Sequence, residues 1–169
     1  MVVLFIGRFQ PFHKGHLAAI KWILKKEKKI SIVIGSNQES LTKDNPFDFK
    51  ERKKMIEETL KKEGIQNFKI FGVPDYKNDV FWAKKILKIT KPNPKKAVVF
   101  TRNAWTAKSF KKIGIMVKPH PLFLNRLSGT KVRNNMWEGK KWKNLVSITV
   151  SDFLNKINYE KRIRSLNKC

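Results

Sequence analysis

The chain has 169 residues, 41% of them hydrophobic, and Lys plus Arg number 38 against 13 Asp plus Glu, a formal net charge of +25. This length and composition are typical of a globular protein with its own hydrophobic core, so we expect a single domain over residues 1–169. Cys169 is the only cysteine, which excludes an intramolecular disulfide and a cysteine metal cluster. No apolar run reaches the roughly 18 residues of a membrane span, and we expect a cytoplasmic protein with no membrane partner.

Five short apolar runs, rich in β-branched residues and mostly bounded by Gly or Pro, are the candidate strands. They are Val2–Ile6, Ile30–Ile34, Phe68–Phe71, Ala97–Thr101 and Ile115–Lys118. The first run is shorter than the apolar part of a signal peptide and no basic residue precedes it, so we interpret it as a strand. All five runs are so continuously apolar that we expect no strand face in contact with water.

Segments with apolar residues at helical spacing lie between these strands. Their apolar positions are Leu17, Ile20, Ile23 and Leu24, then Met55, Ile56 and Leu60, then Val80, Ala83, Ile86 and Leu87. The alternation predicts an α/β, Rossmann-like fold with a parallel five-stranded sheet and helices on both faces. Asp48 and Glu51 predict a capping box for the second helix, and Asp79 is expected to cap the third. We expect a helical C-terminal part from about residue 128, including a helical tail over Ser151–Leu166.

The excess of cationic side chains favours binding of polyanions, whether nucleic acid or phosphorylated metabolites. The lysines are spread over nearly every segment, whereas a protein that reads nucleic acid usually concentrates its cations on one face or tail. We therefore expect nucleic acid to bind only non-specifically. A basic nucleic-acid-binding protein with a vestigial nucleotide site remains an alternative.

The first anion site is predicted directly after the first strand, where residues 7–16 read GRFQPFHKGH and an amphipathic helix begins. Backbone N–H groups and the helix dipole favour negative charge there, and Gly7 and Gly15 allow close approach of a ligand. His13 and His16 add two imidazole donors. Two alternatives stay open: a zinc site with His120 or a scattered carboxylate as a third ligand, or two ordinary surface histidines beside a tight turn.

A second anion site is predicted near the C-terminus, at the sequence Ser128-Gly129-Thr130-Lys131-Val132-Arg133. Ser128 can cap a helix that runs to about Glu138, and Thr130 offers a hydroxyl and a backbone N–H. Side chains in a helix lean towards its N-terminus, so Arg133 can reach back over a bound phosphate. The alternative is an ordinary capped helix that carries a surface arginine.

Several motifs occur together and in a fixed order: residues 7–16, Gly35-Ser36, Asn45-Pro46-Phe47 with Glu51-Arg52, and residues 128–133. In this combination the chain resembles the archaeal-type nicotinamide-nucleotide adenylyltransferases of the nucleotidyltransferase superfamily, over essentially residues 1–150. Residues 139–142, Gly-Lys-Lys-Trp, are similar to that family's Gly-x-Lys-Trp. The resemblance implies transfer of the adenylyl group of ATP to nicotinamide mononucleotide, with Mg²⁺ accompanying ATP, and a homo-oligomer, often a hexamer.

The resemblance also implies roles for individual residues, and none of them is a metal ligand. The expected catalytic residues are His13, His16 and Arg133. The residues expected to bind ATP and its phosphates are Gly7, Arg8, Phe9, Lys14, Gly15, Ser128, Gly129 and Thr130. The residues expected to bind the mononucleotide are Ser36, Arg52, Trp82 and Asn103. Without the resemblance, Trp82 at helical spacing would be core packing and Arg52 a solvent-exposed helix charge.

The chain departs from the family pattern in three places. Thr101-Arg102-Asn103 replaces the usual Ser-Gly-Asn, Lys131 stands where a Glu is common, and residues 75–81 differ before Trp82. The departure at residues 75–81 leaves the choice between the nicotinamide and nicotinic acid mononucleotides open, and the bulky Arg102 bears on recognition of the base. A second hypothesis is an adenylyl or cytidylyl transferase for another phosphorylated acceptor. In either case an acceptor phosphate is mostly dianionic at neutral pH, because its second pKa is about 6, and it needs no general base.

Overall fold

The computed structural model describes residues 2–93 and 96–166. The chain divides into two compact units, each assembled from three segments. We call Met1–Arg8, Ala19–Asn37 and Asn67–Pro121 the sheet unit, and Phe9–Ala18, Gln38–Gln66 and Leu122–Cys169 the helical unit. The single nucleotidyltransferase domain that we expect over residues 1–169 stays a prediction.

The sheet unit contains a five-stranded sheet in which every neighbouring pair is parallel. Its strands are β1 (Val2–Gly7), β2 (Ile30–Ile34), β3 (Phe68–Gly72), β4 (Ala97–Phe100) and β5 (Met116–Lys118), in the spatial order β3-β2-β1-β4-β5. The order reverses between β1 and β4, which makes their carboxyl ends the switch point where ligands of such folds bind. The predicted Rossmann-like parallel sheet is confirmed.

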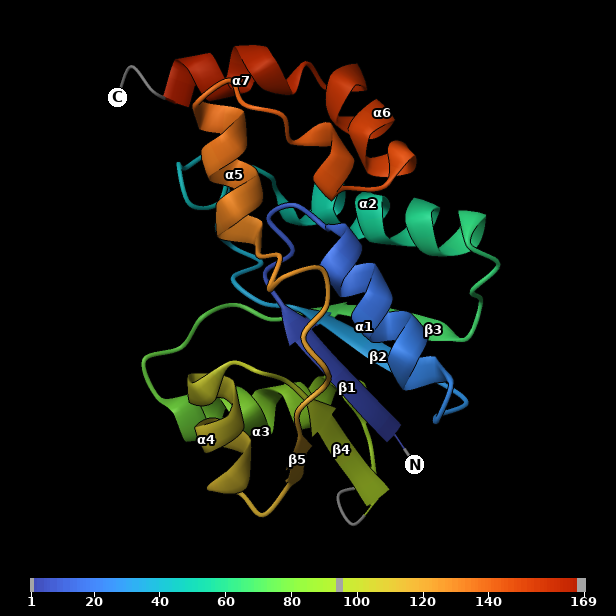
Figure 1. Cartoon of the computed structure of the whole chain (residues 1–169). Helices are drawn as coiled ribbons and strands as arrows, with labels where there is room; N and C mark the ends of the chain where they lie inside the picture. The colour runs from blue at the N-terminus through green and yellow to red at the C-terminus, as the bar shows by residue number, and fades with distance from the viewer. Residues whose placement is uncertain (1, 94–95, 167–169) are drawn as a thin grey trace. The chain divides into compact units, whose positions relative to one another are not determined.

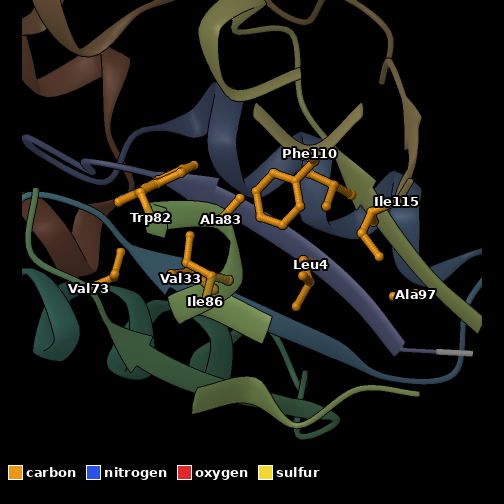
Figure 2. Close-up of a cluster of buried hydrophobic side chains, with 10 residues drawn as sticks. Leu4, Val33, Val73, Trp82, Ala83, Ile86, Ala97, Phe110 and Ile115 are labelled. Carbon is orange, nitrogen blue, oxygen red and sulfur yellow. The ribbon is translucent and has the colours of Figure 1, made fainter. Parts of the chain in front are cut away.

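Helices cover both faces of this sheet. On one face, Leu4 and Val33 join a buried cluster with residues of α3 (Asp79–Thr90) and α4 (Ala104–Lys111); Figure 2 shows Trp82 at one end of it and Ala97 at the other. On the opposite face, Trp22 of α1 (Lys14–Leu24) meets Phe100 edge to face, with ring centroids 5.9 Å apart. Helix α1 begins in the helical unit and ends in the sheet unit.

The two outermost strands differ from the expectation that no strand face meets water. The residues of β3 are half-buried or exposed, and those of β5 alternate between exposed and half-buried. In contrast, every residue of β2 and β4 is buried. A strand at the edge of a sheet has a neighbour on one side only, and this position cannot be read from its own short apolar run.

The helical unit is built from α2 (Phe49–Lys62), α5 (Gly129–Trp137), the short 3₁₀ helix η2 (Lys143–Leu145), α6 (Ile148–Lys156) and α7 (Tyr159–Leu166) (Figure 1). The capping box of α2 is confirmed, because the Glu51 amide donates to Asp48 Oδ1 (2.8 Å) and the Asp48 amide donates to Glu51 Oε2 (3.0 Å). The predicted tail helix is two helices, because Asn158 takes a left-handed conformation (φ 52°) between α6 and α7.

The predicted cap of α3 is wrong by one residue. Asn78 is the N-cap and accepts a hydrogen bond from the Phe81 amide (2.8 Å). Asp79 is the first helical residue and forms an ion pair with Lys112 (2.8 Å), which lowers the pKa of this carboxyl. Within residues 2–93 and 96–166, no helix is long and apolar enough to cross a membrane.

Candidate active site

Two histidines of the helical unit hold each other at the start of α1. The His16 amide donates to His13 Nδ1, and the His13 amide donates to His16 Nδ1, both at 3.3 Å. The two rings stack with centroids 3.6 Å apart and an interplanar angle of 21°. A neutral imidazole carries its proton on one nitrogen only, and each Nδ1 accepts. The neutral rings therefore carry the proton on Nε2 and present two N–H donors.

His13 is neutral at physiological pH. Its side chain is only 4% exposed, and this burial lowers its pKa from the usual 6.5 to about 4. His16 is half-buried and meets the buried Phe9 ring edge on, with centroids 4.8 Å apart. His13 is thus not the surface histidine of the simpler alternative.

The glycine between the histidines lets the loop close tightly. A Cβ on Gly15 would lie 3.0 Å from His13 Nδ1 and 3.4 Å from the Leu127 carbonyl oxygen. Leu127 lies just before the N-cap of α5, Ser128, whose hydroxyl accepts from the Lys131 amide (3.2 Å). Residues 9–16, which we call the histidine loop, and the start of α5 therefore meet within the helical unit.

Gly129, the first residue of α5, is packed against the same loop. A Cβ there would lie 3.2 Å from the Gln10 carbonyl oxygen and 3.3 Å from Arg133 Nη1. Because one neighbour is backbone, any side chain at this position must displace the main chain or Arg133. The glycine keeps the first turn of α5 close to the histidine loop, with its backbone N–H groups at the helix start.

Arg133 joins the two predicted anion sites. It is 5% exposed; Nη1 donates to the Gln10 carbonyl (3.0 Å) and Nη2 donates to Thr130 Oγ1 (3.4 Å). Nη2 also lies 3.6 Å from the exposed carboxylate of Asp44. The structure thus brings the 9–16 loop and the 128–133 segment together, and Arg133 is not the surface arginine of the simpler interpretation.

A second arginine of this unit, Arg52 on α2, has no exposed surface. Its Nε donates to the Asp48 carbonyl (3.2 Å) and its Nη2 donates to the Glu39 carbonyl (3.4 Å). The interpretation of Arg52 as an exposed helix charge is wrong. Arg133 and Arg52 are both cations held in fixed places by backbone carbonyls.

Four predicted site residues lie at strand ends and loops of the sheet unit. Gly7 ends β1 and its carbonyl accepts from the Gly35 amide (3.0 Å), while Arg8 is exposed. Ser36 is buried, has a positive φ of 48° and donates its hydroxyl proton to Asp75 Oδ1 (3.0 Å). Nothing in the sequence singled out Asp75, because its partner is 39 residues away.

Asn103 is the fourth of these residues, and its side chain caps a helix. Its Oδ1 accepts from the Thr106 amide (2.8 Å) and caps α4. The neighbouring Arg102, the bulky departure from the family pattern, donates from Nη1 to the His120 carbonyl (2.9 Å). Its charge is therefore drawn towards the segment after β5.

Trp82 lies in the core of the sheet unit, as the structural alternative expects. It is 3% exposed, with ring centroids 4.7 Å from Trp105 and 5.9 Å from Phe110. Trp105 itself is about half exposed. A role of Trp82 in binding the nicotinamide ring stays a prediction, and it has to be reconciled with this burial.

Three of the remaining predicted site residues are exposed. They are Lys14, Ser128 and Thr130, around the two loops of the helical unit.

The zinc alternative needs a third ligand besides the two histidines. His120, the candidate for it, has its Nδ1 2.8 Å from the Pro121 carbonyl oxygen. In the described residues no three His, Cys, Asp or Glu side chains gather as metal ligands do.

A match to the cytidylyltransferase-like family covers residues 4–135. The nicotinamide-nucleotide adenylyltransferase of Pyrococcus furiosus is 36% identical over 167 residues, which cover 96% of this chain and 87% of the relative. That of Thermoplasma acidophilum is 39% identical over 164 residues, 96% of this chain and 89% of the relative. The chain belongs to the nicotinamide-nucleotide adenylyltransferase family.

Solved structures agree with this family in fold. A bifunctional NMN adenylyltransferase/ADP ribose pyrophosphatase from Francisella tularensis, crystallised with AMP and a manganese ion, matches 98% of this chain with a TM-score of 0.83 and 29% identity. The match spans about half (51%) of that longer chain. A putative nicotinate-nucleotide adenylyltransferase from Vibrio parahaemolyticus, 20% identical with a TM-score of 0.65, covers 90% of this chain and 97% of its own, and it shows the shared fold alone. The adenylyltransferase described here is thus an enzyme of the nucleotidyltransferase class with a Rossmann-like fold.

Proposed function

We propose that this adenylyltransferase transfers the adenylyl group of ATP to nicotinamide mononucleotide, giving NAD and pyrophosphate. The observation that carries the proposal is the meeting of Arg133 with the histidine loop, 123 residues earlier in the chain. One fixed cation, the imidazoles of His13 and His16 and a helix N-terminus form a site suited to phosphate. We infer the acceptor, nicotinamide mononucleotide, from the names of the relatives.

The reaction is a direct in-line displacement. An oxygen of the mononucleotide phosphate attacks the α-phosphorus of ATP, and the bond from that phosphorus to the oxygen bridging to the β-phosphate breaks. The acceptor phosphate is already mostly dianionic at neutral pH, so no proton has to be removed. Catalysis then depends on alignment of the two phosphates and on stabilising the charge that develops on the departing pyrophosphate.

His13, His16 and Arg133 are the catalytic residues of this proposal. The two Nε2–H groups donate to phosphate oxygens, and Arg133 neutralises charge on the leaving pyrophosphate. Gly15 and Gly129 have no side chain, which allows the histidine loop and the start of α5 to approach each other closely. The residues proposed to bind ATP and its phosphates are Gly7, Arg8, Phe9, Lys14, Gly15, Ser128, Gly129 and Thr130.

Magnesium is proposed to arrive with ATP. Mg²⁺ in such enzymes is usually bound through substrate phosphates and water, with one or two carboxylates from the protein. When bound, Mg²⁺ neutralises negative charge on the triphosphate. The protein's own share of that task falls to Arg133 and the backbone N–H groups of α5.

For the mononucleotide we propose Ser36, Arg52, Trp82 and Asn103. Arg52 is the buried cation suited to the mononucleotide phosphate. Trp82 is 3% exposed and would have to uncover its indole face to attract the cationic nicotinamide ring. We also propose a homo-oligomer, a hexamer by resemblance, located in the cytoplasm.

The test is a chromatographic assay with ATP, Mg²⁺ and either pyridine mononucleotide. We expect the dinucleotide and one pyrophosphate per turnover. Pyrophosphate release with another phosphorylated acceptor, and none with either pyridine mononucleotide, would support the second hypothesis of a different transferase. Tight, sequence-selective nucleic-acid binding near physiological salt would instead support the binding-protein alternative.

A further inference from the structure

Gln10 lies in the middle of the histidine loop and is 2% exposed. Its side-chain amide pairs with the backbone of Phe47 in both directions. Nε2 donates to the Phe47 carbonyl (2.8 Å), and Oε1 accepts from the Phe47 amide (3.0 Å), both bonds being buried. This pairing fixes the backbone at residue 10 against the segment that leads into α2.

The backbone of Gln10 in turn holds Arg133. The Gln10 carbonyl accepts from Arg133 Nη1 (3.0 Å), and Gly129 leaves room for both groups. The Arg133 guanidinium therefore takes its position from a carbonyl whose own position depends on the Phe47 contact. A shift of the 45–47 segment would move this carbonyl and, with it, the arginine.

The 45–47 segment is also held by a residue of α7. Arg162 makes a two-pronged ion pair with Glu51, with Nη1 2.6 Å from Oε2 and Nη2 2.8 Å from Oε1. Nη1 also donates to the Pro46 carbonyl (3.2 Å), and the guanidinium lies 6.0 Å from the Phe47 ring centre. Both side chains of the pair are mostly buried, where such bidentate contacts are strong and geometrically specific.

We propose that Gln10 and Arg162 are positioning residues for Arg133. Arg162 of α7 fixes the 45–47 segment, the Gln10 amide carries that placement into the histidine loop, and the Gln10 carbonyl orients the Arg133 guanidinium. In this role neither residue has to touch substrate. The role in catalysis rests on the proposed function, whereas the effect on anion binding does not.

The experiment compares Gln10→Met, Arg162→Met and the double variant with wild type. Gln10→Met keeps the length of the side chain and removes both contacts with Phe47. Arg162→Lys is the milder partner variant, because it keeps the charge and loses the two-pronged geometry. The matched control is Thr59→Val, which removes a 3.2 Å hydroxyl contact with Ser147 in the same unit but away from the 45–47 segment.

Three quantities are measured: the midpoint of thermal unfolding, kcat and KM well below that midpoint, and the affinity for inorganic pyrophosphate by calorimetry. We expect Gln10→Met to lower kcat about 10-fold, since small displacements of a catalytic group are costly, and to weaken pyrophosphate binding. Arg162→Lys should show the same effects at smaller size. The fold-loss of kcat in the double variant should be smaller than the product of the two single fold-losses, because both residues position Arg133 through the same contacts.

Thr59→Val should lower the unfolding midpoint and leave kcat and pyrophosphate affinity unchanged. The proposal is overturned if Gln10→Met and Arg162→Met lower the midpoint as this control does while kcat and pyrophosphate affinity stay within about twofold of wild type. If wild type forms no dinucleotide, the proposed function fails, and pyrophosphate affinity still decides the positioning role.

Discussion

His13 makes the stability of the fold depend on pH in a defined direction. Burial lowers its pKa from 6.5 to about 4, so between these values the unfolded chain binds a proton that the folded chain does not. The free energy of unfolding is therefore largest above pH 6.5, falls as pH falls towards 4, and loses nothing more from this group below that. The full loss is about 3 kcal/mol, and at pH 5.5 it is about 1.4 kcal/mol.

The assay is urea denaturation of wild type and His13→Asn at pH 7.5 and 5.5. The Asn side-chain oxygen can take the place of Nδ1 and accept from the His16 amide, but it does not titrate. Other titrating groups are shared by both proteins, so the difference between their pH dependences isolates His13. We expect wild type to lose about 1.4 kcal/mol more than the variant between the two pH values.

Thr59→Val is the control, because it lowers stability without removing a titrating group and should keep the wild-type pH dependence. If His13→Asn loses as much stability as wild type on acidification, then His13 titrates near 6.5 in the folded protein. In that case the imidazole is not buried as described, and burial does not hold it in the neutral form.

Other changes test the site and the core. His16→Gln should keep at least about fivefold more kcat than His16→Asn, because the Gln amide nitrogen reproduces Nε2 and the Asn amide does not; equal activities would contradict the Nε2–H tautomer. Gly129→Ala should lower kcat about 10-fold in steady-state assays by displacing Arg133 or the Gln10 carbonyl. Unchanged kinetics would show that the histidine loop accommodates the methyl group without moving Arg133. Trp82→Ala should cost about 3 to 5 kcal/mol in urea denaturation; a loss below about 1 kcal/mol would show that Trp82 is not core. Duplex DNA should bind weakly in a titration, with affinity falling steeply as salt rises, and retained affinity would contradict diffuse charge.

The sheet could be predicted from the sequence because its strands are short apolar runs separated by helical periodicity. The run Ile30–Ile34 coincides with β2, which is buried along its whole length. The exposure of β3 and β5 could not be predicted, because it depends on their places at the two edges of the sheet. Strand order is a property of the packing, and local pattern does not contain it.

The motifs predict candidate site residues, and their roles stay predictions, but the motifs do not predict the residues that hold them in place. Arg52 and Arg133 were found by their motifs, but arginine is usually exposed, so their burial could not be expected. Gln10 was missed because its amide is paired with a backbone 37 residues away. Arg162 was missed because Glu51, its partner, lies 111 residues earlier and also has a local role in the capping box.

The division of charge in the helical unit has a consequence for the proposed reaction. Arg52 and Arg133 are cations held in place by backbone carbonyls, whereas His13 is neutral at physiological pH. A neutral N–H donor adds less affinity for bound ATP than an imidazolium would, yet its hydrogen bond strengthens as negative charge grows on the leaving pyrophosphate. Interactions that strengthen only in the transition state raise kcat, whereas those already present with bound substrate do not. Burial of His13 therefore favours turnover over tight binding of substrate and product.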